Sequence, residues 1–201
     1  MLKSNVKRVR LRLLIAVCLV IASVSANAQK RLHFDVDYHY YLTVSERFLG
    51  QSFGRKDIDD MHGNSLRFAV RYDFTGRVSA GAGIGLDWYE GLSYGTAPVF
   101  ATCRYKLIED KGLYAFTNLG YSIGSSDGDP FSRGMMFDLG IGYPIMLTKN
   151  FGINIQLGYN LSQFHNQDFY VVDVSPDIID VNRLKINGCR HSLSFGVGLT
   201  F

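Results

Sequence analysis

The chain has 201 residues, of which 47% are hydrophobic, and it carries 21 Lys and Arg against 18 Asp and Glu. This length suits one domain, and the nearly balanced charge gives no support for a nucleic-acid partner. The three cysteines show no metal-ligand spacing, so no structural zinc site is expected.

The first 28 residues have the pattern of a signal peptide. Five basic residues between Lys3 and Arg12 precede an apolar run over 13–24, and Ala26-Asn27-Ala28 supplies small residues where a signal peptidase cuts. The run is shorter than the roughly 20 residues that a spanning helix needs. We therefore predict cleavage before Gln29, which leaves 29–201 as a single domain. Without those five cations the domain has 16 basic and 18 acidic residues, a net charge of −2.

Eight segments of the remaining chain alternate between apolar and polar residues, which is the pattern of β-strands with two different faces. Thr75-Gly76-Arg77 marks a tight turn, and Pro98 indicates that the fourth strand lies at an edge or starts there. The predicted strands are 33–42, 66–74, 78–88, 99–107, 113–123, 135–145, 151–161 and 192–201.

The last strand ends the chain without a cap, and an open strand edge is not tolerated in a membrane. We therefore predict an all-β fold, a closed, antiparallel, up-and-down transmembrane β-barrel. The strand connections alternate in length, and the longest are 45–65 and 162–190. This alternation is typical of outer-membrane barrels, which have short periplasmic turns and long extracellular loops. An even strand count places both mature termini in the periplasm. Residues 170–174 and 181–186 also look extended, so the last two strands should project beyond the membrane.

The two faces of the predicted barrel differ sharply in charge. The outward positions contain no Asp, Glu, Lys or Arg, whereas a soluble barrel would place its charges outside. Outward aromatic residues such as Trp88 and Phe74 fall near the strand ends, as in the aromatic belts of membrane proteins. The inward charged residues, five acids and four bases, are Asp35, Asp37, Arg67, Arg71, Asp73, Asp87, Arg104, Lys106 and Asp138.

These features resemble the small eight-stranded outer-membrane barrels typified by the OmpA membrane domain and OmpX. The resemblance implies residence in the bacterial outer membrane, contact with its lipid and lipopolysaccharide, and delivery by the barrel-assembly machinery. In this family a C-terminal aromatic residue is part of the insertion signal. The matching positions here are Phe195, Val197, Leu199 and Phe201.

Three functions are compatible with such a barrel. The first is a non-enzymatic scaffold whose loops 45–65 and 162–190 meet an extracellular partner or stabilise the envelope. The second is a narrow, porin-like channel lined by the inward charges. Eight strands enclose an interior that side chains can fill, which favours a sealed core. We expect Asp37 to pair with Arg71, and we expect the inward glycines to receive the rings of inward aromatic residues. Those rings belong to Phe100, Tyr114 and Phe116.

The third function is enzymatic, because some eight-stranded barrels modify lipid A. A Ser-His-acid set could be built from His191 and Ser192 with acidic residues at the same end, although no fixed spacing supports it. The other candidates there are Glu90, His165 and Asp168. The acidic run 57–60 lacks the glycine and the distant glutamate of a calcium loop, so we expect no cofactor. Cys103 and Cys189 should stay unpaired, because they lie at different heights.

Overall fold

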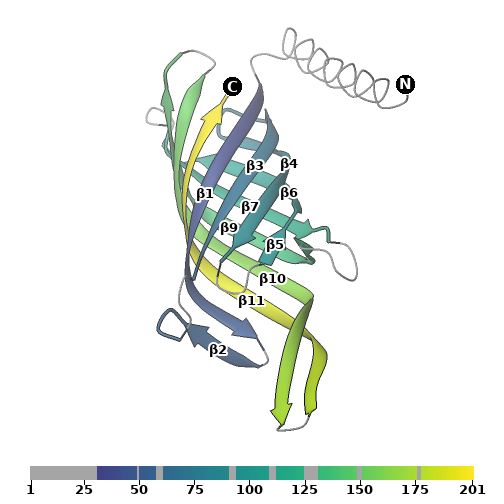
Figure 1. The fold of residues 1–201 in the computed structure, drawn as a ribbon. Helices are drawn as coiled ribbons and strands as arrows, with labels where there is room; N and C mark the ends of the chain where they lie inside the picture. The colour runs from purple at the N-terminus through teal and green to yellow at the C-terminus, as the bar shows by residue number, and fades with distance from the viewer. Residues whose placement is uncertain are drawn as a thin grey trace, which may run out of the picture.

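In the computed structural model, the described residues are 31–48, 50–57, 61–90, 94–108, 112–124, 131–148, 151–175 and 178–201 (Figure 1). The predicted signal peptide lies outside them and stays a prediction. Among the described residues, no helix has the length and apolar character needed to cross a membrane. The strands are β1 (Leu32–Phe48), β2 (Gln51–Gly54), β3 (His62–Asp73), β4 (Val78–Tyr89), β5 (Tyr94–Thr96), β6 (Pro98–Lys106), β7 (Tyr114–Ser122), β8 (Phe131–Ser132), β9 (Gly134–Met146), β10 (Gly152–Ser175) and β11 (Ile178–Thr200).

The long strands form a closed antiparallel ring, which confirms the predicted eight-stranded barrel. Going around it, β1 pairs with β3, and then follow β4, β6, β7, β9, β10 and β11, which pairs again with β1. The closing ladder runs from Asp35 opposite Thr200 to Phe48 opposite Gly188. Backbone hydrogen bonds of 3.0 and 2.9 Å between Phe34 and Phe201 complete it at the chain end. The short strands β2, β5 and β8 lie outside the ring.

The pleat separates the residues as the alternation predicts. On β11, Phe195 and Val197 are exposed on the outer face, while Ser192 and Ser194 are buried inside. The outer wall of the ring is a continuous apolar surface, with Ile84 59% and Leu139 52% exposed. Because the side-chain period of a strand is two, a slip of one residue would turn every charge outward. The strand register is therefore fixed by the need to keep the charged side chains inside and the apolar side chains outside.

Inward glycines make room for three aromatic rings, as expected from the sequence. A Cβ atom built on Gly83 would lie 2.5 Å from Cζ of Phe100, and one built on Gly140 would lie 2.8 Å from Cε1 of Phe116. At Gly142 the three nearest atoms all belong to the side chain of Tyr114, which is its register partner on β7. Glycines on the neighbouring strands thus leave the space in the lumen that these aromatic side chains fill.

The two predicted long loops contain much more strand than expected. Strand β1 continues to Phe48 and turns into β2, and β3 already begins at His62, so 45–65 is largely paired. Strands β10 and β11 pair over nearly the whole of 162–190, as the projecting-strand prediction required. Figure 1 shows β2 and the tip of the β10–β11 hairpin at the end of the barrel opposite to the C-terminus.

A β-bulge at Val44 changes the alternation of β1. Thr43 faces Ser192 and Ser45 faces His191, so Val44 has no register partner on β11. Thr43 and Glu46 are fully buried, whereas Val44 is 53% exposed. One extra residue in the strand shifts all later side chains by one position. The inward residue beyond the bulge is consequently Glu46 and not its neighbours.

The contact between Gly142 and Tyr114 can be tested by a double-mutant cycle. Gly142→Ala should lower the free energy of unfolding by about 1–3 kcal/mol, because the added methyl overlaps the ring. In a Tyr114→Ala background the same change should cost much less, since the ring is gone. Unfolding in lipid vesicles can be followed by the fluorescence of Trp88. Equal costs in both backgrounds would contradict this account of the glycine.

Candidate functional site in the barrel lumen

The candidate site is the polar interior of the barrel, and its first cluster lies near the chain ends. Asp35 accepts hydrogen bonds from Nε and Nη2 of Arg71, the latter at 3.0 Å, and also from the Thr200 hydroxyl. Nη2 of Arg104 lies 3.4 Å from Asp35 and 3.4 Å from Asp37. Two buried aspartates therefore face two buried arginines, and charge-assisted hydrogen bonds offset their desolvation.

The expected pair of Asp37 with Arg71 is wrong, and the strand register explains why. Asp37 lies opposite Arg67 on β3, while Arg71 lies opposite His33. Asp35 is thus two residues from the position facing Arg71, but Asp37 is four residues away. Asp37 instead accepts from Arg104 and from Nε2 of Gln156 at 3.2 Å.

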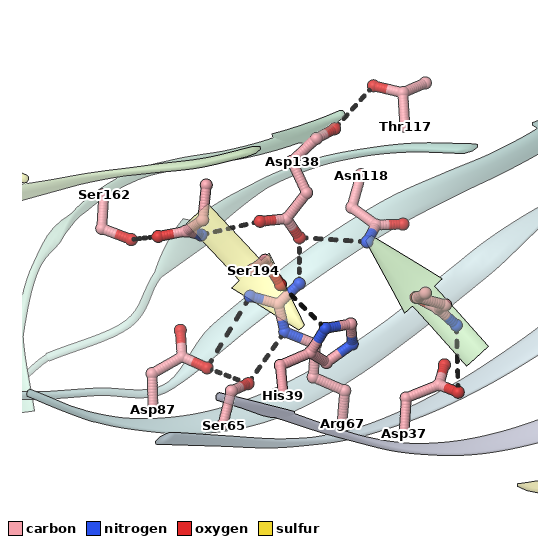
Figure 2. Close-up of polar contacts among 12 residues, drawn as sticks. Asp37, His39, Ser65, Arg67, Asp87, Thr117, Asn118, Asp138, Ser162 and Ser194 are labelled. Atoms are coloured by element: carbon pink, nitrogen blue, oxygen red, sulfur yellow. Dashed lines mark hydrogen bonds and ion pairs between the residues drawn. The ribbon is translucent and has the colours of Figure 1, made fainter. Parts of the chain in front are cut away.

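The second cluster surrounds Arg67 in the middle of the barrel (Figure 2). Its guanidinium forms an ion pair with Asp138 and lies 3.8 Å from Asp87. Nε of Arg67 donates to the Ser65 hydroxyl at 3.0 Å, and the same hydroxyl donates to Asp87. Asp138 also accepts from two amide side chains at 3.0 and 2.7 Å, those of Asn118 and Asn160.

His39 lies between the two clusters and is buried. Its Nδ1 is 3.1 Å from the hydroxyl of Ser194, which lies diagonally across the strand pair, and its ring covers its register partner Gly196. Figure 2 shows the imidazole beside the Arg67 side chain. The histidine therefore fills the section of the lumen between the two groups of ion pairs.

An aromatic layer closes the lumen above Arg67. The rings of Tyr41 and Tyr89 are stacked with centroids 5.8 Å apart, and the Phe164 ring meets Tyr89 edge-on at 5.2 Å. All three residues are at most 1% exposed. The Tyr89 hydroxyl is bonded to Ser162 at 2.6 Å. Side chains from β1, β4 and β10 thus meet across the interior, and these three described residues expose almost no surface.

A third ion pair, between Glu46 and Arg190, lies at the base of the projecting strands. Nη2 of Arg190 is 2.7 Å from Oε2 of Glu46 and also donates to the Glu90 carbonyl at 3.1 Å. The guanidinium lies 5.2 Å above the Tyr89 ring, and both charged residues are fully buried. Sequence reasoning missed this pair because of the bulge at Val44. Extending the alternation of the last strand two residues back from Ser192 would have placed Arg190 inside.

Most of the predicted inward charges lie in these clusters, with two exceptions. Asp73 sits at the end of β3, half-buried and bonded to His33 at 3.0 Å. Lys106 is exposed at the end of β6 and does not line the lumen, because the barrel wall ends there. The charged residues inside the two clusters are Asp35, Asp37, Arg67, Arg71, Asp87, Arg104 and Asp138.

The candidate Ser-His-acid set is not assembled by the described residues. His191 and Ser192 are consecutive on β11 and point to opposite faces, so they cannot pair. Ser192 is buried against the Thr43 hydroxyl at 3.2 Å, while His191 is bonded to Tyr159 outside. The side chain of Asp168 lies outside the described residues.

No cluster of metal-ligating side chains occurs among the described residues. In the acidic run 57–60, Asp57 accepts from the Gly54 amide at 2.7 Å, and 58–60 lie outside the described part. Cys103 and Cys189 are both free, as expected.

No protein-family model and no curated protein matches the chain. Several solved structures are similar to it. Neisserial surface protein A has 15% identity and a TM-score of 0.44, covering 85% of this chain and 97% of the other. The outer membrane protein OprG from Pseudomonas aeruginosa has 13% identity and a TM-score of 0.41, with coverages of 85% and 96%. The outer membrane protein AlkL has 12% identity and a TM-score of 0.40, with coverages of 85% and 90%.

Removing the central cation should destabilise the barrel strongly. Arg67→Met leaves Asp87 and Asp138 buried without their counter-ion, which typically costs about 3–5 kcal/mol. Lys106→Met is the matched control, because this exposed residue lies outside the clusters and should change stability by less than about 0.5 kcal/mol. Both can be measured by denaturant unfolding in vesicles. Equal, small effects would show that the buried pairs do not hold the lumen together.

Proposed function

We propose that this protein is an integral outer-membrane barrel that acts as a non-enzymatic scaffold and presents its projecting strands at the cell surface. The membrane location is supported by the outer wall. Large apolar side chains are exposed all around the ring, including Leu157 at 49% and Phe195 at 48%. Such a surface is unfavourable in water but matches the hydrocarbon of a bilayer. The buried face carries the charges, as in outer-membrane barrels.

We propose an orientation of the barrel on the basis of the connections between its strands. The links from β3 to β4 and from β6 to β7 are short, and they lie at the same end as the start of β1 and the end of β11. The β10–β11 hairpin and β2 lie at the other end. In outer-membrane barrels short turns face the periplasm and long connections face the outside. We therefore place the mature termini in the periplasm and the hairpin outside the cell, among lipopolysaccharide headgroups.

The filled lumen is the observation that carries the scaffold function. A conducting path needs a continuous polar surface that water can reach, but Arg67, Asp87 and Tyr41 are at most 2% exposed. The ion pairs compensate one another's charge, and the aromatic layer covers them. Among the described residues, those at that level offer almost no surface to a solute, which supports a role for the outer face and the projecting strands.

The projecting strands are the proposed presenting element. Beyond the barrel rim, β10 from Gln167 to Ser175 pairs with β11 alone, and β2 pairs with β1 alone. These strands are anchored at their base by Glu46 and Arg190. We propose that an extracellular partner or the surrounding envelope contacts this end. The similarity to the OmpA membrane domain and OmpX, and delivery by the barrel-assembly machinery through the C-terminal strand, belong to the same proposal.

The sealed lumen can be tested by recording single-channel currents of the refolded mature protein in a planar bilayer. The wild-type protein should give no stable conductance, and Arg71→Ala should also stay silent, because the layer of Tyr41, Tyr89 and Phe164 remains. Co-flotation of the protein with vesicles verifies insertion independently. Discrete current steps in the wild type, altered by Arg71→Ala, would contradict the scaffold and identify a narrow channel.

The projecting hairpin should be separable from the barrel. Replacing 167–186 by a two-residue Asn-Gly turn should change the free energy of unfolding by less than about 1 kcal/mol, because that ribbon pairs only with itself. Arg190→Ala should cost about 3–5 kcal/mol, because it leaves Glu46 buried without a counter-ion. Denaturant unfolding measures both. A barrel that cannot fold without 167–186 would make the hairpin structural rather than presenting.

A further inference from the structure

Three polar side chains form a cluster on the outer face of the barrel, next to the projecting strands. Sγ of Cys189 lies 3.7 Å from Nε2 of His191, and Nδ1 of the same ring is hydrogen-bonded to the Tyr159 hydroxyl. Cys189 and His191 are two residues apart on β11 and so share a face. Tyr159 is on β10, opposite Leu193. None of these groups takes part in the lumen clusters.

The arrangement is that of a nucleophile, a base and a group that orients the base. A neutral imidazole has one acceptor and one donor nitrogen. If the thiol donates to Nε2, then Nδ1 carries the proton and donates to the oxygen of Tyr159. The ring is thereby held with its free lone pair toward the sulfur. This is the geometry in which a histidine can accept a thiol proton.

The cysteine is also accessible and lacks a disulfide partner. Cys189 is half-buried rather than enclosed, and the other cysteine of the mature chain, Cys103, is free as well and lies on β6. The compartment proposed above permits disulfides, where an unpaired cysteine points to intermolecular exchange. Arg47 on β1 is the register partner of Cys189 and is exposed, so a cation stands beside the sulfur on the same face.

We propose that Cys189 is a thiol-exchange site that forms a mixed disulfide with small, negatively charged disulfides, with His191 as the proton acceptor and Arg47 attracting the anion. The thiol proton passes to Nε2 of His191 while the sulfur attacks one sulfur of the incoming disulfide. The old S–S bond breaks, and the departing thiolate takes the proton from Nε2. One disulfide is consumed and one is formed, so no other oxidant is required.

The test uses the mature protein with Cys103→Ser in detergent micelles, so that Cys189 is the single thiol. Oxidised glutathione is the anionic probe, cystamine is the cationic probe, and the mass increase of the intact protein reports the reaction rate. His191→Asn removes the base and Tyr159→Phe removes its orienting partner. Arg47→Gln removes the cation. Circular dichroism verifies that each variant is folded.

At pH 7 a free thiol with a pKa of about 8.5 is only about 3% ionised, which leaves room for acceleration of about 30-fold by a base. We expect His191→Asn to slow the reaction with oxidised glutathione about tenfold or more. Measured from neutral to alkaline pH, the difference between the two proteins should be largest at neutral pH, where an unassisted thiol is mostly protonated, and should narrow as the pH rises. Tyr159→Phe should give a smaller loss. Arg47→Gln should lower the preference for oxidised glutathione over cystamine.

Equal rates and equal pH profiles for the parent and His191→Asn would overturn the proposal, because Cys189 would then react as an ordinary thiol. An unchanged preference between the two probes in Arg47→Gln would overturn the assignment of an anionic substrate. The reaction is measured on the outer wall in micelles. The thiol-exchange proposal can therefore be refuted while the lumen is shown to be sealed, and it can be supported even if the scaffold function is refuted.

Discussion

The pairing of β1 with β11 is the constraint on which the rest of the molecule depends. A sheet that closes on itself has no open edge in the ring, so its backbone groups are satisfied by neighbouring strands even in a bilayer. Closure also separates an inner face from an outer face, because every second residue of each strand must then point into the lumen. The distribution of charge, the glycine-backed rings and the apolar wall are all consequences of this one geometric condition.

A lumen of eight strands is narrow, and the chain fills it with charged and amide side chains rather than with aliphatic ones. Asp35 pairs with Arg71 and shares Arg104 with Asp37, while Arg67 holds two aspartates with help from serine and asparagine side chains. Burial of one such charge alone would be costly, so the members of each cluster stabilise the fold only together. This interdependence makes the interior a structural element of the fold, as the proposed scaffold function requires.

The sequence predicts the strands well, because alternation over many residues has a period that only a two-faced strand explains. The sequence does not predict which charged side chains form ion pairs with one another. That choice depends on the stagger between neighbouring strands, which moves Arg71 from Asp37 to Asp35. Lys106 fits the alternation but falls where the wall ends. The sequence groups His191 with Ser192, but adjacent residues of a strand point to opposite faces. His191 instead contacts Cys189, two residues away on the same face. Local patterns therefore define faces, whereas partners come from the three-dimensional register.

The bulge at Val44 has a consequence for how this end of the barrel can change in length. Strand β1 has one extra residue there, and this extra residue determines whether each later side chain of the strand points inward or outward. Loss of one residue at this point would restore a regular ladder in which Glu46 still faces Arg190. Loss of one residue elsewhere in the inner part of β1 would reverse the parity of everything beyond it. Val44 is thus the position at which the strand tolerates a deletion of one residue without exchanging its inside for its outside.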